Sequence, residues 1–158
     1  MYSPIFDFME NNFDLVKTIA IGADHAGFEY KSTLRDWLTA KGYHITDHGT
    51  YAPESVDYPD YAHPLAMQVE SREASFGILL CGSANGVCMT ANKHKDIRAA
   101  LCWQTDVARL ARQHNNANVI CIPARFVSIH LAMEMIEVFM HTVFEGGRHQ
   151  KRVEKISS

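Results

Sequence analysis

Short apolar segments rich in β-forming residues alternate along this chain with longer segments in which apolar residues recur at helical spacing. Strand character is found at 18–23, around Ile45, and at 76–81, 98–102 and 118–122. Helical spacing is found at 27–41, 61–71, after GSANG through Lys93, at 105–114 and at 128–144. This alternation predicts an α/β fold in which five parallel strands are flanked by helices on both faces.

Local sequence features also predict where helices end and which strands are buried. Gly42 stands where a glycine commonly ends a helix, and the pair at 146–147 is expected to end the long helix before a basic tail. The continuous apolar runs FGILLC (76–81) and VICI (119–122) are typical of parallel strands that are covered on both faces.

Composition limits the class of protein. The chain has 158 residues, of which 47% are hydrophobic, and a net charge of −3. These values predict one globular domain over 1–158 and make nucleic acid a poor candidate partner. No apolar run reaches the ~18–20 residues of a membrane span. The four cysteines form no CxxC pair, which favours reduced thiols. The N-terminal residues do not follow a signal-peptide pattern, so we expect a cytoplasmic protein.

Ligands of such folds bind beyond the carboxyl ends of the strands, and GADHAG (22–27) follows the first strand there. It does not match GxGxxG, because Asp24 stands at the position of the second glycine. It is not a P-loop either, because Phe28 and Glu29 replace the required Lys-Ser/Thr. Two interpretations remain open for this turn. Asp24 and His25 bind an anion or sugar hydroxyl, or Asp24 only caps the next helix.

CGSANG (81–86) follows the third expected strand and opens a helix. Its backbone N–H groups are suited to an oxyanion, and a thiol at a helix N-terminus is expected to have a lowered pKa. Cys81 is therefore a candidate base or nucleophile, or else a structural cysteine beside a tight turn. The phosphatase pattern is absent because Val87 replaces its arginine, and the other three cysteines are expected to be inert core residues.

Two further segments carry candidate groups. RQHNNAN (112–118) places His114 and Asn115 at a helix end, where they act as acid, base or ligand, or simply terminate the helix. GGRHQKR (146–152) places Arg148 and Arg152 four residues apart, which suits a phosphate but also a solvated basic tail. Arg125 is a third candidate phosphate ligand. No HExxH or zinc-finger spacing is present, so no metal site is expected.

Taken together, these blocks resemble the type B ribose-5-phosphate isomerase family, which includes isomerases of allose and galactose 6-phosphates. The resemblance runs from Thr18 to Ile156 and leaves residues 1–16 as an N-terminal extension. Its blocks are GADHAG, DHGT (47–50), VDYPDYA (56–62), CGSANG with TANK (90–93), RQHNNANV and EGGRHQKRVEKI.

The resemblance implies a Rossmann-like three-layer α/β/α sandwich, and a homodimer, with a tetramer as the alternative, whose active sites lie between subunits. It also implies aldose–ketose isomerisation of a sugar phosphate without metal or cofactor. Cys81 would move a proton between C1 and C2 through an enediolate, Ser83 would assist, and His114 would open the sugar ring. The implied substrate-binding residues are Asp24, His25, Tyr58, Gly82, Ala84, Asn85, Gly86, Asn115, Arg125, Arg148 and Arg152.

Ala84 departs from the family pattern, which has glycine at this position. If the position needs a positive φ or close approach, alanine is strained there or blocks the sugar. Ribose 5-phosphate is the expected substrate, and a six-carbon or four-carbon sugar phosphate is the alternative. A phosphosugar-binding protein without turnover and a Cys/His hydrolase also remain open, although the hydrolase lacks a recognisable third group.

Overall fold

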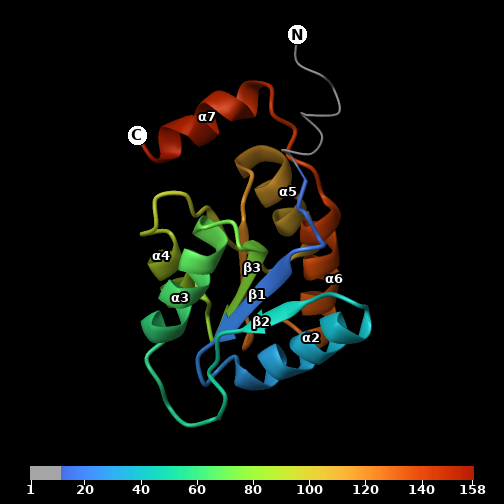
Figure 1. Ribbon diagram of the computed structural model, residues 1–158, viewed down its shortest axis with the longest axis vertical. Coiled ribbons are helices and arrows are strands. Elements are labelled where there is room, and N and C mark those ends of the chain that lie inside the picture. Colours follow the sequence, from blue (N-terminus) through green and yellow to red (C-terminus); the bar gives the residue numbers. More distant parts are fainter. Residues whose placement is uncertain (1–11) are drawn as a thin grey trace.

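The computed structural model describes residues 12–158, and its strands form one parallel sheet (Figure 1). The sheet has the order β2-β1-β3-β5-β4. Its strands are β1 (Thr18–Ala23), β2 (Ile45–Asp47), β3 (Ala74–Cys81), β4 (Ala99–Leu101) and β5 (Val119–Pro123). All neighbouring pairs are parallel, so the predicted five-stranded sheet is confirmed.

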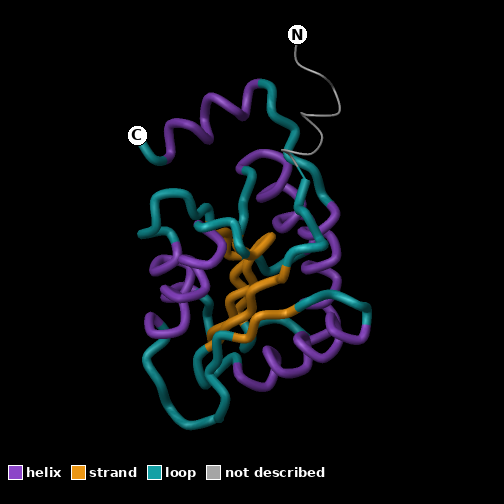
Figure 2. Tube along the Cα trace, viewed as in Figure 1, coloured by secondary structure: helices purple, strands orange, loops and turns teal. Residues whose placement is uncertain are grey.

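Helices cover both faces of the sheet, and the strands form the central layer in Figure 2. On one face lie α2 (Phe28–Ala40), α5 (Thr105–Asn115) and α6 (Ile129–His141), and on the other lie α3 (Pro59–Glu70) and α4 (Asn85–Ala91). The last helix, α7 (Arg148–Ile156), lies beyond one end of the sheet (Figure 1). The predicted three-layer α/β/α architecture is therefore confirmed.

Each face of the sheet has its own apolar core. Ile78 and Leu80 of β3 point to the α2, α5 and α6 side, whereas Leu79 points to the α3 and α4 side. All three side chains are fully buried, and each such side chain contributes roughly 1.5–3 kcal/mol of hydrophobic stabilisation. Because β3 is covered on both faces, its position and its carboxyl end are firmly held.

Most predicted boundaries agree with the structure, but α6 is shorter than the sequence predicts. It ends at His141, and Thr142 already has extended dihedral angles, so Gly146 and Gly147 do not terminate it. The Nε of Arg112 donates a hydrogen bond to the Thr142 carbonyl and holds the chain in this non-helical path. The residues after Gly147 form α7 rather than an unstructured tail. Gly42, by contrast, follows α2 with φ +94°, as predicted.

The end of the N-terminal extension packs against the body of the protein. The ring of Phe13 lies 4.7 Å from that of Phe76 and 5.5 Å from that of Phe139, between ring centroids. The guanidinium of Arg112 lies 4.0 Å from the centroid of the Phe13 ring. Residue 13 thus adds to the apolar core, while residues 1–11 of the predicted extension lie outside the described residues.

The state of the cysteines and the length of the helices bear on where in the cell the protein is expected to work. Cys81, Cys88, Cys102 and Cys121 are all free, and Cys102 and Cys121 are buried as predicted, whereas Cys88, also predicted to be a core residue, is only half-buried. Within residues 12–158 no helix combines the length and apolar character required to cross a membrane.

Candidate active site

The carboxyl ends of β1 and β3 bring Cys81 and Asp24 together. These strands are neighbours, and Ala23 lies in register with Leu80. The chain leaves β1 for one edge of the sheet and leaves β3 for the other, so this is a point where strand order switches. The Sγ of Cys81 donates a hydrogen bond to Oδ2 of Asp24 at 3.1 Å. Two predicted site residues that are 57 positions apart are therefore in direct contact.

The ionisation of Cys81 differs from the sequence-based expectation. Burial and the neighbouring Asp24 carboxylate raise the pKa of the Cys81 thiol to about 11. Backbone N–H groups of Gly82 and Ala84 at the start of α4 act in the opposite direction but are outweighed. The predicted lowered pKa of Cys81 is wrong for this chain alone, because burial of the thiol and the Asp24 carboxylate together outweigh the effect of the helix N-terminus.

Asp24 fixes the turn before α2 rather than capping the helix itself, whose N-cap residue is Gly27, and its binding of a sugar hydroxyl stays a prediction. Oδ1 accepts hydrogen bonds from the backbone N–H groups of Ala26 at 2.9 Å and Gly27 at 3.2 Å, which fixes the turn before α2. Oδ2 faces Cys81. A Cβ on Gly27 would lie 2.8 Å from the backbone of Leu80, so only glycine lets this turn lie against β3.

The loop from Gly82 to Gly86 contains the departure at Ala84. Ala84 has φ +63°, in the left-handed region, and is fully buried. Its methyl group belongs to the apolar core on the α3 and α4 side of the sheet, and its positive φ strains the backbone. Ser83 and Asn85 are exposed beside it, and the Asn85 side chain donates a hydrogen bond to Ser83 Oγ at 3.2 Å.

Three more predicted ligands lie at this carboxyl edge. Tyr58 covers Gly86 so closely that a Cβ there would lie 2.5 Å from its ring. The Nδ1 of His25 accepts a hydrogen bond from the Val56 N–H at 3.2 Å, so the proton of the neutral ring is on Nε2. Arg125 follows β5, and its guanidinium would lie 3.1 Å from a Cβ on Gly82. Most of the predicted site is therefore assembled around Cys81.

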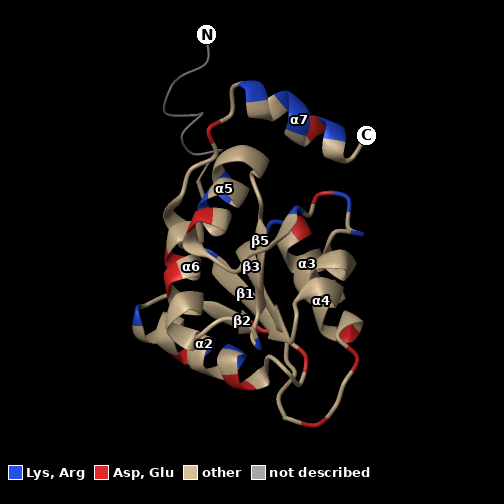
Figure 3. Cartoon of the chain, turned by 180° about the vertical axis from the view of Figure 1, so that it is seen from behind, with Lys and Arg blue, Asp and Glu red and all other residues tan. Residues whose placement is uncertain are grey.

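The remaining predicted residues lie at the opposite, amino edge of the sheet. His114 and Asn115 end α5, which runs back from the carboxyl edge, and Arg98 at the start of β4 binds the Asn115 carbonyl. Arg148 and Arg152 are exposed on α7, whose basic character is visible in Figure 3. A strand such as β5, with five residues, spans roughly 15 Å, so the two sets cannot meet within one chain.

His149 lies against His114 at the amino edge, and the sequence analysis did not single it out. The two rings stack with centroids 4.2 Å apart and planes 14° apart. Oε2 of Glu145 lies 3.6 Å from Nε2 of His149. Burial lowers the pKa of His149, and the neighbouring His114 and Arg148 lower it further. The ligand-type atoms of these three side chains lie within 4.8 Å of one another, so His114, Glu145 and His149 form one cluster at the amino edge.

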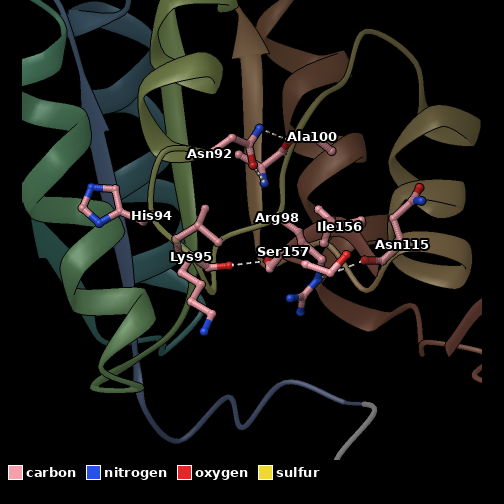
Figure 4. Close-up of a pocket in the computed structure, with 12 residues that line it drawn as sticks. Asn92, His94, Lys95, Arg98, Ala100, Asn115, Ile156 and Ser157 are labelled. Carbon is pink, nitrogen blue, oxygen red and sulfur yellow. Dashed lines mark hydrogen bonds between the residues drawn. The ribbon is translucent and has the colours of Figure 1, made fainter. Parts of the chain in front are cut away.

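A recess of about 550 Å³ lies next to this cluster and is shown in Figure 4. It is bounded by Asn115, by Arg98 and Lys95 near β4, and by the end of α7. Ser157 Oγ donates a hydrogen bond to the Lys95 carbonyl at 2.7 Å, which connects α7 to the segment before β4. The Nε of Arg98 donates to the carbonyls of Asn115 and Asn116 and so fixes the end of α5.

This arrangement defines a class of protein. A thiol next to a carboxylate at a switch point, surrounded by backbone N–H groups, is suited to moving a proton on a small molecule. Arginines at both edges favour an anionic molecule such as a phosphate ester. Fold and site together thus indicate an α/β enzyme that acts on a small phosphorylated substrate.

Comparison with known proteins identifies the family. Residues 19–156 match the Ribose/Galactose Isomerase family, and the chain belongs to it. Ribose-5-phosphate isomerase B of Escherichia coli (strain K12) is 41% identical over 90% of this chain and 96% of its own. D-erythrulose-4-phosphate isomerase of Pectobacterium atrosepticum is 45% identical over 88% and 92%.

A solved structure extends this similarity to three dimensions. Ribose-5-phosphate isomerase B of Mycoplasma genitalium, with bound ribulose-5-phosphate, has a TM-score of 0.86 and 40% sequence identity to this chain. The match covers 90% of this chain and 95% of that structure. The expected family is therefore confirmed, and the chain is an aldose–ketose isomerase.

Proposed function

We propose that this isomerase interconverts ribose 5-phosphate and ribulose 5-phosphate, with Cys81 as the base. The position of Cys81, beside the Asp24 carboxylate and the backbone N–H groups of Gly82 and Ala84, carries this proposal, because it puts a group able to take up a proton next to donors for an oxyanion. The Cys81 thiolate removes the proton from C2 of the open aldose and returns it to C1. In this proposal, backbone N–H groups of the 82–86 loop stabilise the enediolate between these steps, and Ser83 assists proton transfer between the two oxygens.

Two subunits complete each site in this proposal. The set at the carboxyl edge of one chain meets His114, Asn115, Arg148 and Arg152 from the amino edge of a second chain. A twofold homodimer forms two such sites, because each edge of one subunit then faces the opposite edge of the other. The separation of the two sets across the sheet supports this assembly, since neither is a complete site alone.

In this proposal, the second subunit also lowers the pKa of Cys81, which is high in the separate chain. Cationic groups close to a thiol favour its thiolate form. Arg148 and Arg152 of a second chain, neutralised in part by the substrate phosphate, would bring such charge to the Cys81 loop. In the proposed site, Cys81 therefore acts as a base in the assembled enzyme, whereas its thiol is protonated in the separate chain near neutral pH.

The phosphate is held in this proposal by His25 and Arg125 from one chain and by Arg148 and Arg152 from the other. Within residues 12–158, no ion pair engages Arg125, Arg148 or Arg152, so their guanidinium groups are available to an anion. Asp24 and Tyr58 position the sugar hydroxyl groups, with Asn115 nearby. The reaction proposed for these residues uses neither metal nor cofactor.

A four-carbon sugar phosphate is the second candidate substrate, because a relative named D-erythrulose-4-phosphate isomerase is 45% identical to this chain. The experiment measures ketose formation by the purified protein from ribose 5-phosphate, and from erythrose 4-phosphate and allose 6-phosphate in parallel, without added metal. The proposal expects the highest kcat/KM for ribose 5-phosphate. A higher kcat/KM for erythrose 4-phosphate or allose 6-phosphate would change the substrate assignment to that sugar. If none of the three sugar phosphates were converted, the proposal that this protein isomerises them would be contradicted.

We further propose a cytoplasmic protein organised as one domain with a short N-terminal extension. The four free thiols support a reducing compartment, and Phe13 supports an extension that packs on the same core. The proposed partners are the sugar phosphate and a second copy of the chain, without nucleic acid or membrane.

A further inference from the structure

The ring of His114 is held in an unusual way for a proposed acid–base group. It is half-buried, and within residues 12–158 no hydrogen bond engages either of its ring nitrogens. Its contact with the flat face of His149, at 4.2 Å between centroids, is therefore what restricts its rotation. Stacking of this kind leaves both ring nitrogens of His114 free to meet a substrate.

The supporting ring is itself fixed in place. His149 is only 5% exposed, although it lies in the first turn of a helix whose other side chains are mostly exposed. Oε2 of Glu145 lies 3.6 Å from its Nε2, and the Glu145 N–H donates a hydrogen bond to the Gln113 carbonyl at 3.1 Å. Residues 145 and 149 are thereby connected to the end of α5, next to His114.

We propose that His149 is a positioning residue for the opening of the sugar ring, holding the His114 imidazole by stacking while Glu145 fixes His149. This inference rests on the proposed function, because it concerns one step of that reaction. His149 itself has its face against His114 and does not need to touch the substrate. Its effect is on the orientation of His114 only.

Ring opening is a separate proton-transfer step. In the furanose form of ribose 5-phosphate, His114 takes the proton of the C1 hydroxyl and returns it to O4 as the C1–O4 bond breaks and the aldehyde forms. Ribulose 5-phosphate does not need this step, because esterification of its O5 prevents closure to a furanose. The two substrates of the same equilibrium therefore differ in their need for a well-placed His114.

The experiment uses this difference in the full-length protein with two measurements. The first is the rate of ribulose 5-phosphate formation from ribose 5-phosphate. The second is the rate at which ribulose 5-phosphate incorporates deuterium at C1 in D₂O, which reports proton transfer at Cys81 without ring opening. His149→Ala removes the stacking ring, and His149→Phe replaces it with another flat ring. His141→Ala is the matched control, since His141 makes a similar i,i+4 contact with Glu137 but is 55% exposed on α6.

We expect His149→Ala to slow ribulose 5-phosphate formation about fivefold to tenfold, in keeping with the loss of one aromatic contact. Deuterium incorporation should stay within about twofold of the wild type, and His149→Phe should recover most of the lost turnover. Equal loss in both measurements, no loss in either, or a His149→Phe variant as slow as His149→Ala would overturn the inference. A wild-type protein without turnover or exchange would instead overturn the proposed function.

Discussion

The two edges of the sheet differ in how their functional side chains are held. At the carboxyl edge, Cys81 and Asp24 are in contact, and glycines at 27 and 86 allow neighbouring segments to approach closely. At the amino edge, Arg148 and Arg152 project from a helix without an ionic partner among residues 12–158. The proposed base at the carboxyl edge is thus held in a fixed contact, whereas the proposed phosphate ligands at the amino edge lie on an exposed helix.

This difference suggests a division of tasks between fold and assembly. Groups that move protons need fixed geometry, which the end of β3 provides for Cys81 and which stacking on His149 provides for His114. Groups that recognise a phosphate can lie on an exposed helix until a second subunit and the substrate complete their environment. Variants at the two edges should therefore fail in different ways.

The largest effect is expected at the carboxyl edge. Cys81→Ala removes the proposed base and should lower kcat roughly 10³-fold or more, while binding of a phosphate ligand survives. Steady-state kinetics and calorimetric titration with a non-reactive sugar phosphate measure the two effects. Cys88→Ala, a second half-buried thiol nearby, is the control, and substantial turnover by Cys81→Ala would remove Cys81 from the proposed role.

The amino edge should show weaker binding instead. Arg148→Ala and Arg152→Ala each remove a charged hydrogen-bond donor and should raise KM roughly 10- to 100-fold, with a smaller change in kcat. Lys155→Ala, another cation of α7, serves as the control. An unchanged KM in both arginine variants would contradict their assignment to the phosphate.

The carboxyl edge can be tested further through the Cys81 thiol, whose pKa is raised to about 11 in part by Asp24. Asp24→Asn removes the negative charge, so the pKa should fall and the thiolate fraction at pH 8 should rise. Alkylation of Cys81 by iodoacetamide should become about tenfold faster, while turnover decreases. The Cys88→Ala background leaves Cys81 as the accessible thiol, since Cys102 and Cys121 are buried. Unchanged or slower alkylation would show that Asp24 does not raise this pKa.

The smallest effect concerns strain in the same loop. Ala84→Gly relieves a left-handed backbone and should raise the free energy of unfolding by about 1 kcal/mol. Ala66→Gly, at a fully buried position within α3, is the control, because glycine in a helix interior is expected to destabilise by about 1 kcal/mol. Urea unfolding of both variants measures the difference, and a destabilised Ala84→Gly would argue against strain at this position.

Local features of the fold were readable from sequence, whereas contacts between distant segments were not. The alternating pattern predicted the sheet, and Gly42 marked the end of α2 because a positive φ after a helix favours glycine. The end of α6 at His141 was missed, since it depends on Arg112 reaching the Thr142 carbonyl from another helix.

The same limit applies to the site. Cys81 and Asp24 were both candidates, but the effect of one on the pKa of the other depends on the pairing of β1 with β3. His149 stood inside a recognised block, yet nothing in its spacing shows that it stacks on a residue from α5. The resemblance to a family supplied the site residues, and the structure added that they divide between two edges.

Mixing two inactive variants tests most directly whether the edges of different subunits form one site. Cys81→Ala and His114→Ala homodimers are each expected to be nearly inactive. After joint unfolding and refolding at equal amounts, half of the dimers are mixed, and each mixed dimer contains one fully native site and one doubly altered site. The account predicts recovery of about one quarter of the wild-type activity. No recovery, with mixed dimers shown to be present by mass spectrometry, would contradict it.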